Sequence, residues 1–221
     1  GGMAFGTAGA YAAGSASIEV RHSQKGHTYS AYKFASLTVD GDAVQVGTDA
    51  DWVTAVTDAV AAANNNMDPV VSMPSEYDSN PAAFAATKTS DNDAAWFRTF
   101  AASLAVGDGV VADKTVAGNG GTAAIGSLEE GWYLITDVDK DGGRGTNAIV
   151  ATTLNGVAAT FKVKGDPATG QGKINAVGMF VAKNENEPDQ PGKTADTITT
   201  TEGVSIGQTV AYTITLDIPN A

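Results

Sequence analysis

The sequence predicts a mainly β protein: an Ig-like antiparallel β-sandwich with a helical insertion. Two observations carry this prediction. Short segments rich in Val, Ile, Thr and Tyr lie between turns of Gly, Asp and Asn along most of the chain, which is typical of a sandwich. Only between about residues 49 and 104 do apolar residues recur every three or four positions, which indicates helices.

Strands are expected on both sides of this insertion. The stretch SIEVRHSQKGHTYSAYKF, residues 17–34, predicts two strands around a turn at Gly26, and LTVDGDAVQVG predicts a hairpin that turns at Asp40-Gly41. After the insertion, four further strand candidates are WYLITDV, NAIVATTL, VAATFKVK and KINAVGMFV.

Two helical segments are expected in the insertion. The first begins after Asp49, follows an apolar period of three to four, and ends at residues 64–66. The second follows Pro81 and is interrupted by TKTSDND. Its stronger half, residues 93–104, has one apolar side, made of Trp96, Phe97, Phe100 and Leu104. We expect these segments to cover one edge or end of the sandwich.

Composition excludes several classes of function. The 221 residues carry a net charge of −12, and the few Lys and Arg residues are scattered, which argues against nucleic acid or an anionic membrane as partner. With no Cys and two His, the chain has little material for a metal enzyme or a nucleophile–histidine triad, so we expect no enzyme. There is no apolar run of 18 residues, as a spanning helix would need.

The chain divides into four parts by composition. Residues 1–14 are small and uncharged, with an A-x-A pattern at Ala10-Tyr11-Ala12, so we expect a leader or the remnant of an export signal; a flexible leader is the alternative. Residues 15–183 are the expected first domain, and residues 184–192 form a polar linker. Residues 193–221 hold two alternating strands, too few for a core of their own, so we expect the first strands of a second Ig-like domain.

Lys183 stands where the apolar segment ends and the acidic linker begins, in GMFVAKNENEP, residues 178–188. An amine is nucleophilic only when it is neutral, and apolar neighbours such as Phe180 and Val181 favour that form. A strand end would also present the side chain at a fixed place beside an open linker. The alternative interpretation is an ordinary solvated lysine at the end of a strand.

The segment DVDKDGGRG resembles half of a calcium-binding loop. Asp137, Asp139, Asp141 and Gly142 match the alternate oxygen ligands and the glycine bend of an EF-hand. The twelfth position is Ala148, so the bidentate glutamate is missing. An acidic hairpin turn is therefore the favoured interpretation, with a weak Ca²⁺ site as the alternative, and we expect no other cofactor.

Three motifs resemble those of one family, the sortase-assembled major pilins that form the pilus shaft of Gram-positive bacteria. GHTYSAYKF at residues 26–34 is similar to the strand that opens their N-terminal domain, and EEGWYLITD at residues 129–137 is similar to a later strand. VSIGQTVAYTITLDIP at residues 204–219 is similar to the start of their following domain and is the most specific of the three. With the lysine junction, the resemblance covers nearly the whole chain from Ser17 onward.

The resemblance implies a structural subunit of an extracellular, cell-wall-anchored pilus. Lys183 and Asn184 match the last two residues of the family's Tyr-Pro-Lys-Asn motif, while Val181 and Ala182 replace the first two. The implied reaction is attack by the Lys183 ε-amine on the acyl-enzyme that a pilus sortase forms on the sorting-signal threonine of another subunit, which gives an isopeptide bond. The implied partners are identical subunits and the sortase, with a host receptor left open.

The resemblance also bears on bonds within one subunit. Lys193 matches the lysine of an internal Lys–Asn isopeptide bond in the second domain, whose partner would lie beyond Ala221; a linker lysine is the alternative. We expect no such bond in the first domain, because Arg21 and Thr136 stand where its lysine and glutamate would be. A different class of function, an adhesin or carbohydrate-binding module, would need a groove or an exposed aromatic patch instead of a reactive Lys183.

Overall fold

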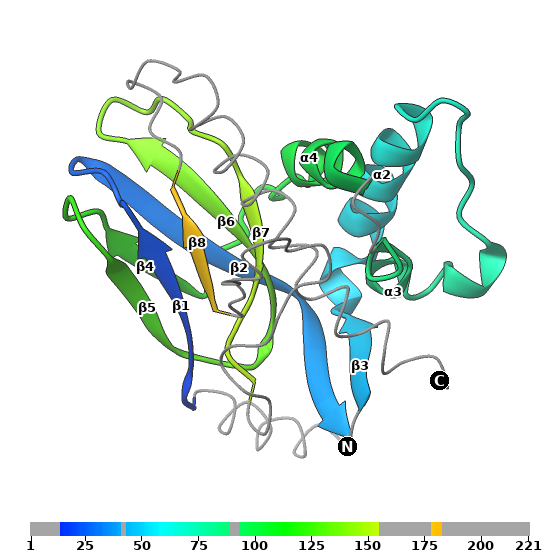
Figure 1. Ribbon diagram of the computed structural model, residues 1–221, viewed down its shortest axis with the longest axis horizontal. Coiled ribbons are helices and arrows are strands. Elements are labelled where there is room, and N and C mark those ends of the chain that lie inside the picture. Colours follow the sequence, from blue (N-terminus) through cyan, green and yellow to red (C-terminus); the bar gives the residue numbers. More distant parts are fainter. Residues whose placement is uncertain (1–13, 41–42, 89–92, 155–177, 183–221) are drawn as a thin grey trace, which may run out of the picture.

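The computed structural model describes residues 14–40, 43–88, 93–154 and 178–182. Within these ranges the chain forms two β-sheets with a group of helices beside them (Figure 1). The predicted β-sandwich with a helical insertion is therefore confirmed. Among the described residues, no helix is long and apolar enough to cross a membrane.

The smaller sheet has the strand order β5-β1-β8. Strand β1 (Ala16–Arg21) buries every second side chain, as its alternating sequence predicts. It pairs antiparallel with β5 (Ala123–Leu128) and parallel with the short strand β8 (Met179–Val181). The β1–β8 pair is the exception in a fold whose other described strand pairs are antiparallel.

The larger sheet is built around the long strand β2 (His27–Asp40). One edge of β2 pairs with β6 (Gly131–Asp139), and β6 pairs in turn with β7 (Ala148–Ala151). The other edge pairs first with β4 (Lys114–Ala117) and then with β3 (Ala43–Thr48). A β-bulge between Lys33 and Ala35 interrupts the β2–β6 register, and such bulges bend and twist a strand.

Both faces of β6 are covered. Side chains alternate between the two faces of a strand, and the first seven residues of β6 are all buried. On one face, the ring of Trp132 lies 5.3 Å from that of Phe34 and 6.5 Å from that of Phe97, which belongs to the helices. On the other face, Ile135 and Asp137 line a pocket against β8. Strand β6 thus connects the helical layer to the interior of the sandwich.

The helices lie between β3 and β4 in the sequence and together at one end of the sheets in space (Figure 1). The strongest predicted helix buries Trp96, Phe97 and Phe100, as its aromatic side predicts. The Phe100 ring packs edge-on against Phe34 of β2, with 6.1 Å between centroids, so the insertion covers one end of the sandwich as expected. Its elements are η1 (Ala50–Trp52), α2 (Val53–Asn65), η2 (Ser75–Tyr77), α3 (Pro81–Ala85) and α4 (Ala94–Ser103).

Three details of the strands differ from the predictions. The turn at Gly26 joins β1 to β2, but the two strands belong to different sheets and do not pair. The end of the segment 17–34 and the start of LTVDGDAVQVG were predicted as separate strands, but β2 spans both and runs unbroken for 14 residues. Strands β4 and β5 were not among the predicted segments. The candidate VAATFKVK lies outside the described residues, as do the predicted linker, residues 184–192, and the predicted start of a second domain, residues 193–221.

Candidate functional site

Strand β8 is held by backbone hydrogen bonds on each side. Gly178 N donates to Ala151 O at 2.9 Å, and Glu19 N donates to Gly178 O at 2.7 Å. At the other end of the strand, Ala182 N donates to Arg21 O at 2.8 Å. These three bonds attach β8 to β1 and to the end of β7.

The side chains of this segment reinforce that position. Phe180 and Ala182 are buried, with 7% and 5% of their surface exposed, while Met179 and Val181 are half-buried. Lys183 is the next residue in the sequence. Lys183, Asn184 and Lys193 themselves lie outside the described residues, so their roles stay predictions.

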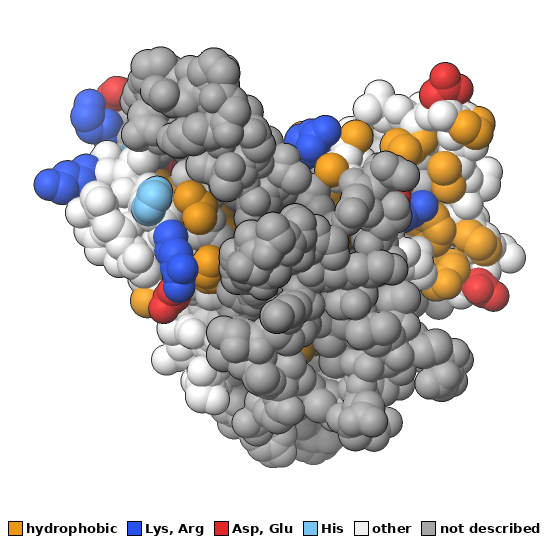
Figure 2. Space-filling model, in the orientation of Figure 1, with side chains coloured by type: hydrophobic (Ala, Val, Ile, Leu, Met, Phe, Trp, Pro, Cys, Tyr) orange, Lys and Arg blue, Asp and Glu red, His pale blue; other side chains and the backbone are white. Residues whose placement is uncertain are grey.

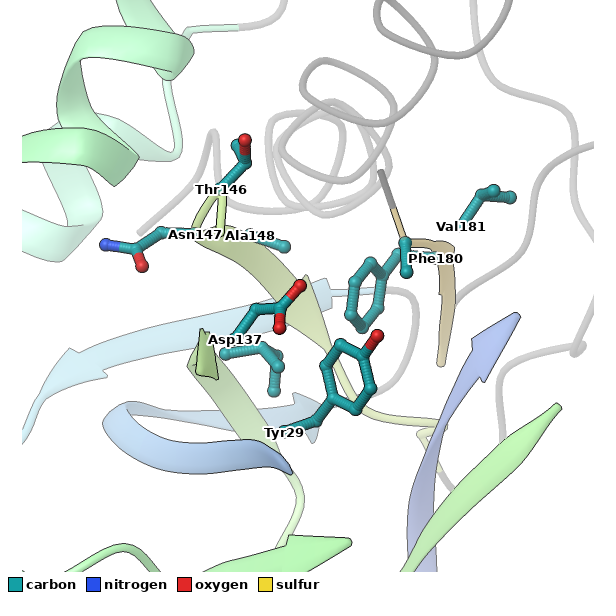
Figure 3. A pocket seen from close by; sticks show the side chains of 9 residues that line it. Tyr29, Asp137, Thr146, Asn147, Ala148, Phe180 and Val181 are labelled. Carbon is teal, nitrogen blue, oxygen red and sulfur yellow. The ribbon is translucent and has the colours of Figure 1, made fainter. Parts of the chain in front are cut away.

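A pocket lies where β8 meets β2, β6 and the segment that leads into β7 (Figure 3). Asp137 is the one charged residue of its lining, and its carboxylate points toward the ring of Phe180 (Figure 3). The lining consists of Tyr29, Ile135, Asp137, Thr146, Asn147, Ala148, Phe180, Val181 and Ala182. The structure thus brings together Asp137, predicted as a calcium ligand, and the strand that leads to Lys183.

Asp137 is paired with His27, a residue to which sequence analysis gave no role. The His27 Nδ1 and Asp137 Oδ1 atoms lie 2.5 Å apart, and the side chains are 16% and 6% exposed. The pair forms because the β2–β6 register places Tyr29 opposite Asp137 and His27 opposite Asp139. A separation of 110 residues explains why no local sequence signal reveals this pair.

Two neighbours shape the surroundings of the Asp137 carboxylate. A Cβ on Gly145 would lie 2.6 Å from Asp137 Oδ2, so a larger residue there would have to displace the carboxylate. Tyr29 is buried, and its hydroxyl accepts a hydrogen bond of 2.9 Å from Gln24 N. Burial raises the pKa of Tyr29, and the negative charge of Asp137 raises it further. Tyr29 therefore remains an uncharged phenol beside the carboxylate.

The acids of the predicted calcium loop form the expected hairpin turn. Asp139 Oδ1 accepts hydrogen bonds of 2.8 Å from the backbone N–H groups of Asp141 and Gly143, and these bonds lower the pKa of Asp139. Asp141 pairs with Lys140 at 3.3 Å. Among the described residues, no three His, Asp or Glu side chains gather into a group that could hold a metal ion. A weak Ca²⁺ site, the alternative to the acidic hairpin turn, is left to a direct titration.

Sequence analysis also missed a charged cluster around Lys33. Its Nζ lies 2.9 Å from Asp49 Oδ2, 2.9 Å from Ser36 Oγ and 3.6 Å from Glu129 Oε1. The Lys33 side chain is 11% exposed. Arg21, which stands where the bond-forming lysine of the pilin family would be, is exposed and pairs with Glu19 at 3.0 Å.

The adhesin alternative predicts an exposed aromatic patch. Trp52, Trp96 and Trp132 are 9%, 0% and 0% exposed, so they belong to the core. In the part of the chain that the structure describes, the exposed large hydrophobic residues are valines: Val70, Val110 and Val111. Figure 2 shows apolar side chains on the helical part of the visible face, beside acidic residues.

Comparisons with known proteins give a faint structural likeness. No family model and no curated protein matches the chain. The solved structures found include two of the full-length major pilin RrgB from Streptococcus pneumoniae and one of the pilus backbone RrgB from the same organism. They show 15%, 14% and 13% sequence identity, with TM-scores of 0.27, 0.28 and 0.28.

The alignments cover 77%, 79% and 77% of this chain, but only 30%, 31% and 41% of those structures. The chain thus spans well under half the length of the pilins that it matches. At these values the likeness establishes no family for this chain.

Proposed function

We propose that this chain is part of a structural subunit of a covalent cell-surface pilus, joined to the next subunit through Lys183. One structural observation carries the proposal: strand β8 is fixed on β1 up to Ala182, directly before this lysine. The lysine junction and the three motifs at residues 26–34, 129–137 and 204–219 support it from the sequence.

The fixed strand end suits the reaction. A sortase must bring an acyl group, carried as an enzyme ester or thioester, to one amine among the lysines of the subunit. Holding the chain in one orientation removes much of the entropic barrier to such an encounter. The neutral ε-amine of Lys183 attacks the acyl carbon, the bond to the sortase breaks, and the proton lost by the amine goes to the departing group. The product is an isopeptide bond, with Asn184 part of the motif that the sortase recognises.

The same proposal places the other predicted features. The partners are identical subunits and a pilus sortase, the location is the cell wall outside the cell, and a host receptor is left open. Residues 15–183 form the first domain, residues 184–192 the linker and residues 193–221 the start of a second domain. Lys193 belongs to an internal isopeptide bond of that second domain.

The test is a lysine substitution in the organism that makes the protein. Lys183→Arg keeps the positive charge but removes the nucleophile, so the ladder of high-mass polymers on a denaturing gel should disappear. Lys25→Arg, at an exposed lysine of the β1–β2 turn, is the control and should leave the ladder intact. Tandem mass spectrometry of wild-type cell wall should find a threonine carboxyl joined to Lys183. Polymers that persist in Lys183→Arg would refute the proposal.

A further inference from the structure

We infer that the side chain of Asn80 closes the outer edge of β3, and that without it this edge pairs with the β3 of a second copy of the chain. Asn80 belongs to the helical insertion and lies directly before α3. The inference gives the insertion a role besides covering one end of the sandwich, namely to keep copies of the chain apart. It does not depend on the linkage role of Lys183.

Strand β3 lies at one end of the strand order β3-β2-β6-β7 in the larger sheet. Among the described strands it pairs with β2 alone, so alternate backbone N–H and C=O groups of β3 point away from the sheet. Its sequence, AVQVGT, contains no charged residue and no proline, the features by which edge strands commonly avoid pairing with other chains. The strand itself therefore offers no such protection.

The amide of Asn80 is bonded to the outer edge of β3. Its Oδ1 accepts a hydrogen bond of 2.9 Å from Thr48 N, and its Nδ2 donates one of 2.9 Å to Val46 O. These two backbone groups flank Gly47, and one residue of a parallel neighbouring strand would bond to the same two groups. The side chain of Asn80 thus takes the place of one residue of a strand.

These bonds replace the usual role of an asparagine before a helix. Such a side chain commonly accepts a hydrogen bond from a backbone N–H of the first turn, but that of Asn80 makes no bond of this kind. Instead, the Thr48 hydroxyl donates to Asn80 Oδ1 at 2.7 Å and accepts the N–H of Ala82 at 2.9 Å. The end of β3 therefore caps α3, which lies beside it (Figure 1), while the residue before α3 closes β3.

The backbone around Asn80 holds the amide in this position. Asn80 N donates to Tyr77 O at 2.8 Å, and the Tyr77 ring packs edge-on against Phe84 of α3, with 5.5 Å between centroids. Pro81, the first residue of α3, has a fixed φ and restricts the residue before it. The contact with β3 is thus supported from both sides of Asn80 and is a built part of the fold.

The partner that Asn80 excludes is a second β3. Identical edges can pair about a twofold axis, because each edge then offers the same donors and acceptors to the other. Three of the six residues of β3 are β-branched, which favours strand pairing, and the strand carries no charge that would repel its own copy. Removal of the Asn80 amide should therefore yield a dimer of the chain.

The test measures the self-association of the full chain by sedimentation velocity over a range of concentrations. Asn80→Ala should form a dimer as its concentration rises, whereas the wild type should remain a monomer. Asn64→Leu, which breaks the buried hydrogen bond from Trp96, is the control for loss of stability and should also remain a monomer. In monomeric Asn80→Ala the amide of Thr48 should exchange its hydrogen about tenfold faster than in the wild type, and it should slow again in the dimer.

A second substitution distinguishes edge pairing from a general loss of stability. Val44 N points to the same side of β3 as Thr48 N, since these backbone groups alternate along a strand. Val44→Pro removes this donor and should return Asn80→Ala to the monomer, whereas a proline would not rescue a chain that associates because it is destabilised. If Asn80→Ala does not fold, Asn80→Ser replaces it, because serine is also a favourable residue before a helix but lacks the amide.

The inference is overturned by a folded Asn80 variant that stays monomeric, or by a dimer that Val44→Pro leaves intact. Equal association of Asn64→Leu would overturn it too, since loss of stability would then be the cause. Assemblies larger than a dimer would mean that the edge takes a strand other than a second β3, which contradicts the twofold pairing.

Discussion

The indole nitrogen of Trp96 donates a hydrogen bond of 2.8 Å to the side-chain oxygen of Asn64. The bond joins α4 to α2, and the two residues are 0% and 3% exposed. Because a buried donor is unfavourable without a partner, the bond favours one packing of these helices over others. The helical layer is thus set by a specific polar contact as well as by its aromatic rings.

Replacing this acceptor should destabilise the fold. Asn64→Leu leaves the Trp96 N–H unpaired and should lower the free energy of unfolding by about 1–3 kcal/mol. Asn65→Leu, at an exposed neighbour on the same helix, should change it by less than about 0.5 kcal/mol. Chemical denaturation of both variants measures the difference. Equal effects would show that the hydrogen bond does not secure the helices.

Gly178 should be needed for the docking of β8. Its φ is +86°, and a Cβ there would lie 2.8 Å from Thr153 Cγ2 and 3.1 Å from Ser17 O. Gly178→Ala should therefore lower the free energy of unfolding by about 2–4 kcal/mol, through left-handed strain and a steric clash. Gly142 also has a positive φ, +88°, but no atom lies within 4 Å of an added Cβ. Gly142→Ala therefore introduces the strain without the clash, and it should lower the free energy of unfolding by about 1–2 kcal/mol.

Hydrogen exchange gives a local measure of the same change. In Gly178→Ala the amide of Ala182, which is bonded to Arg21 O, should exchange faster than in the wild type. Unchanged exchange of this amide would mean that β8 does not depend on Gly178.

The ion pair between Lys33 and Asp49 should contribute a salt-dependent part of the stability. The two side chains are 11% and 29% exposed, so the pair is partly shielded from water. Asp49→Asn should lower the free energy of unfolding by about 1 kcal/mol at low salt and by less at high salt. Asp51→Asn, at an exposed acid two residues away, should have almost no effect. If the decrease in the free energy of unfolding of Asp49→Asn does not vary with salt, Asp49 contributes through hydrogen bonding alone.

The turn at Asp139 should weaken in acid. Backbone hydrogen bonds from Gly143 and Asp141 lower the pKa of Asp139 below its ordinary value of 3.8. The folded state therefore favours the charged form. The resulting stabilisation is fully present above pH 3.8 and is lost as the pH falls through the lower, folded-state pKa. The amide resonances of Gly143 and Asp141 should titrate with that lower midpoint, and a midpoint above 3.8 would contradict the assignment.

The elements of this fold were predictable where the signal is local. The aromatic side of α4 and the alternation of β1 are patterns of a few neighbouring residues, and both were predicted correctly. Pairing partners were harder, because β1 pairs with β5 and β8 from distant parts of the chain. Strand β5 lacks a strong pattern of its own, since its sequence AAIGSL is mostly small residues.

In the candidate site, too, local features were predictable from the sequence and long-range contacts were not. The end of a strand before Lys183 was visible in the local sequence, and β8 ends where that prediction places it. The contact between Asp137 and His27 depends on the register of β2 against β6, which no local pattern encodes. The regular spacing of Asp137, Asp139 and Asp141 suggested a shared ligand, but their hydrogen bonds and ion pairs go to separate partners.

The parallel pairing of β1 with β8 has a mechanical consequence. Tension applied to the chain before Ala16 and after Ala182 pulls the two strands lengthwise past each other, because they run in the same direction. The hydrogen bonds between them are then loaded in shear and share the force, whereas strands peeled apart from one end break their bonds one at a time. A pair of strands joined in this way resists stretching between Ala16 and Ala182.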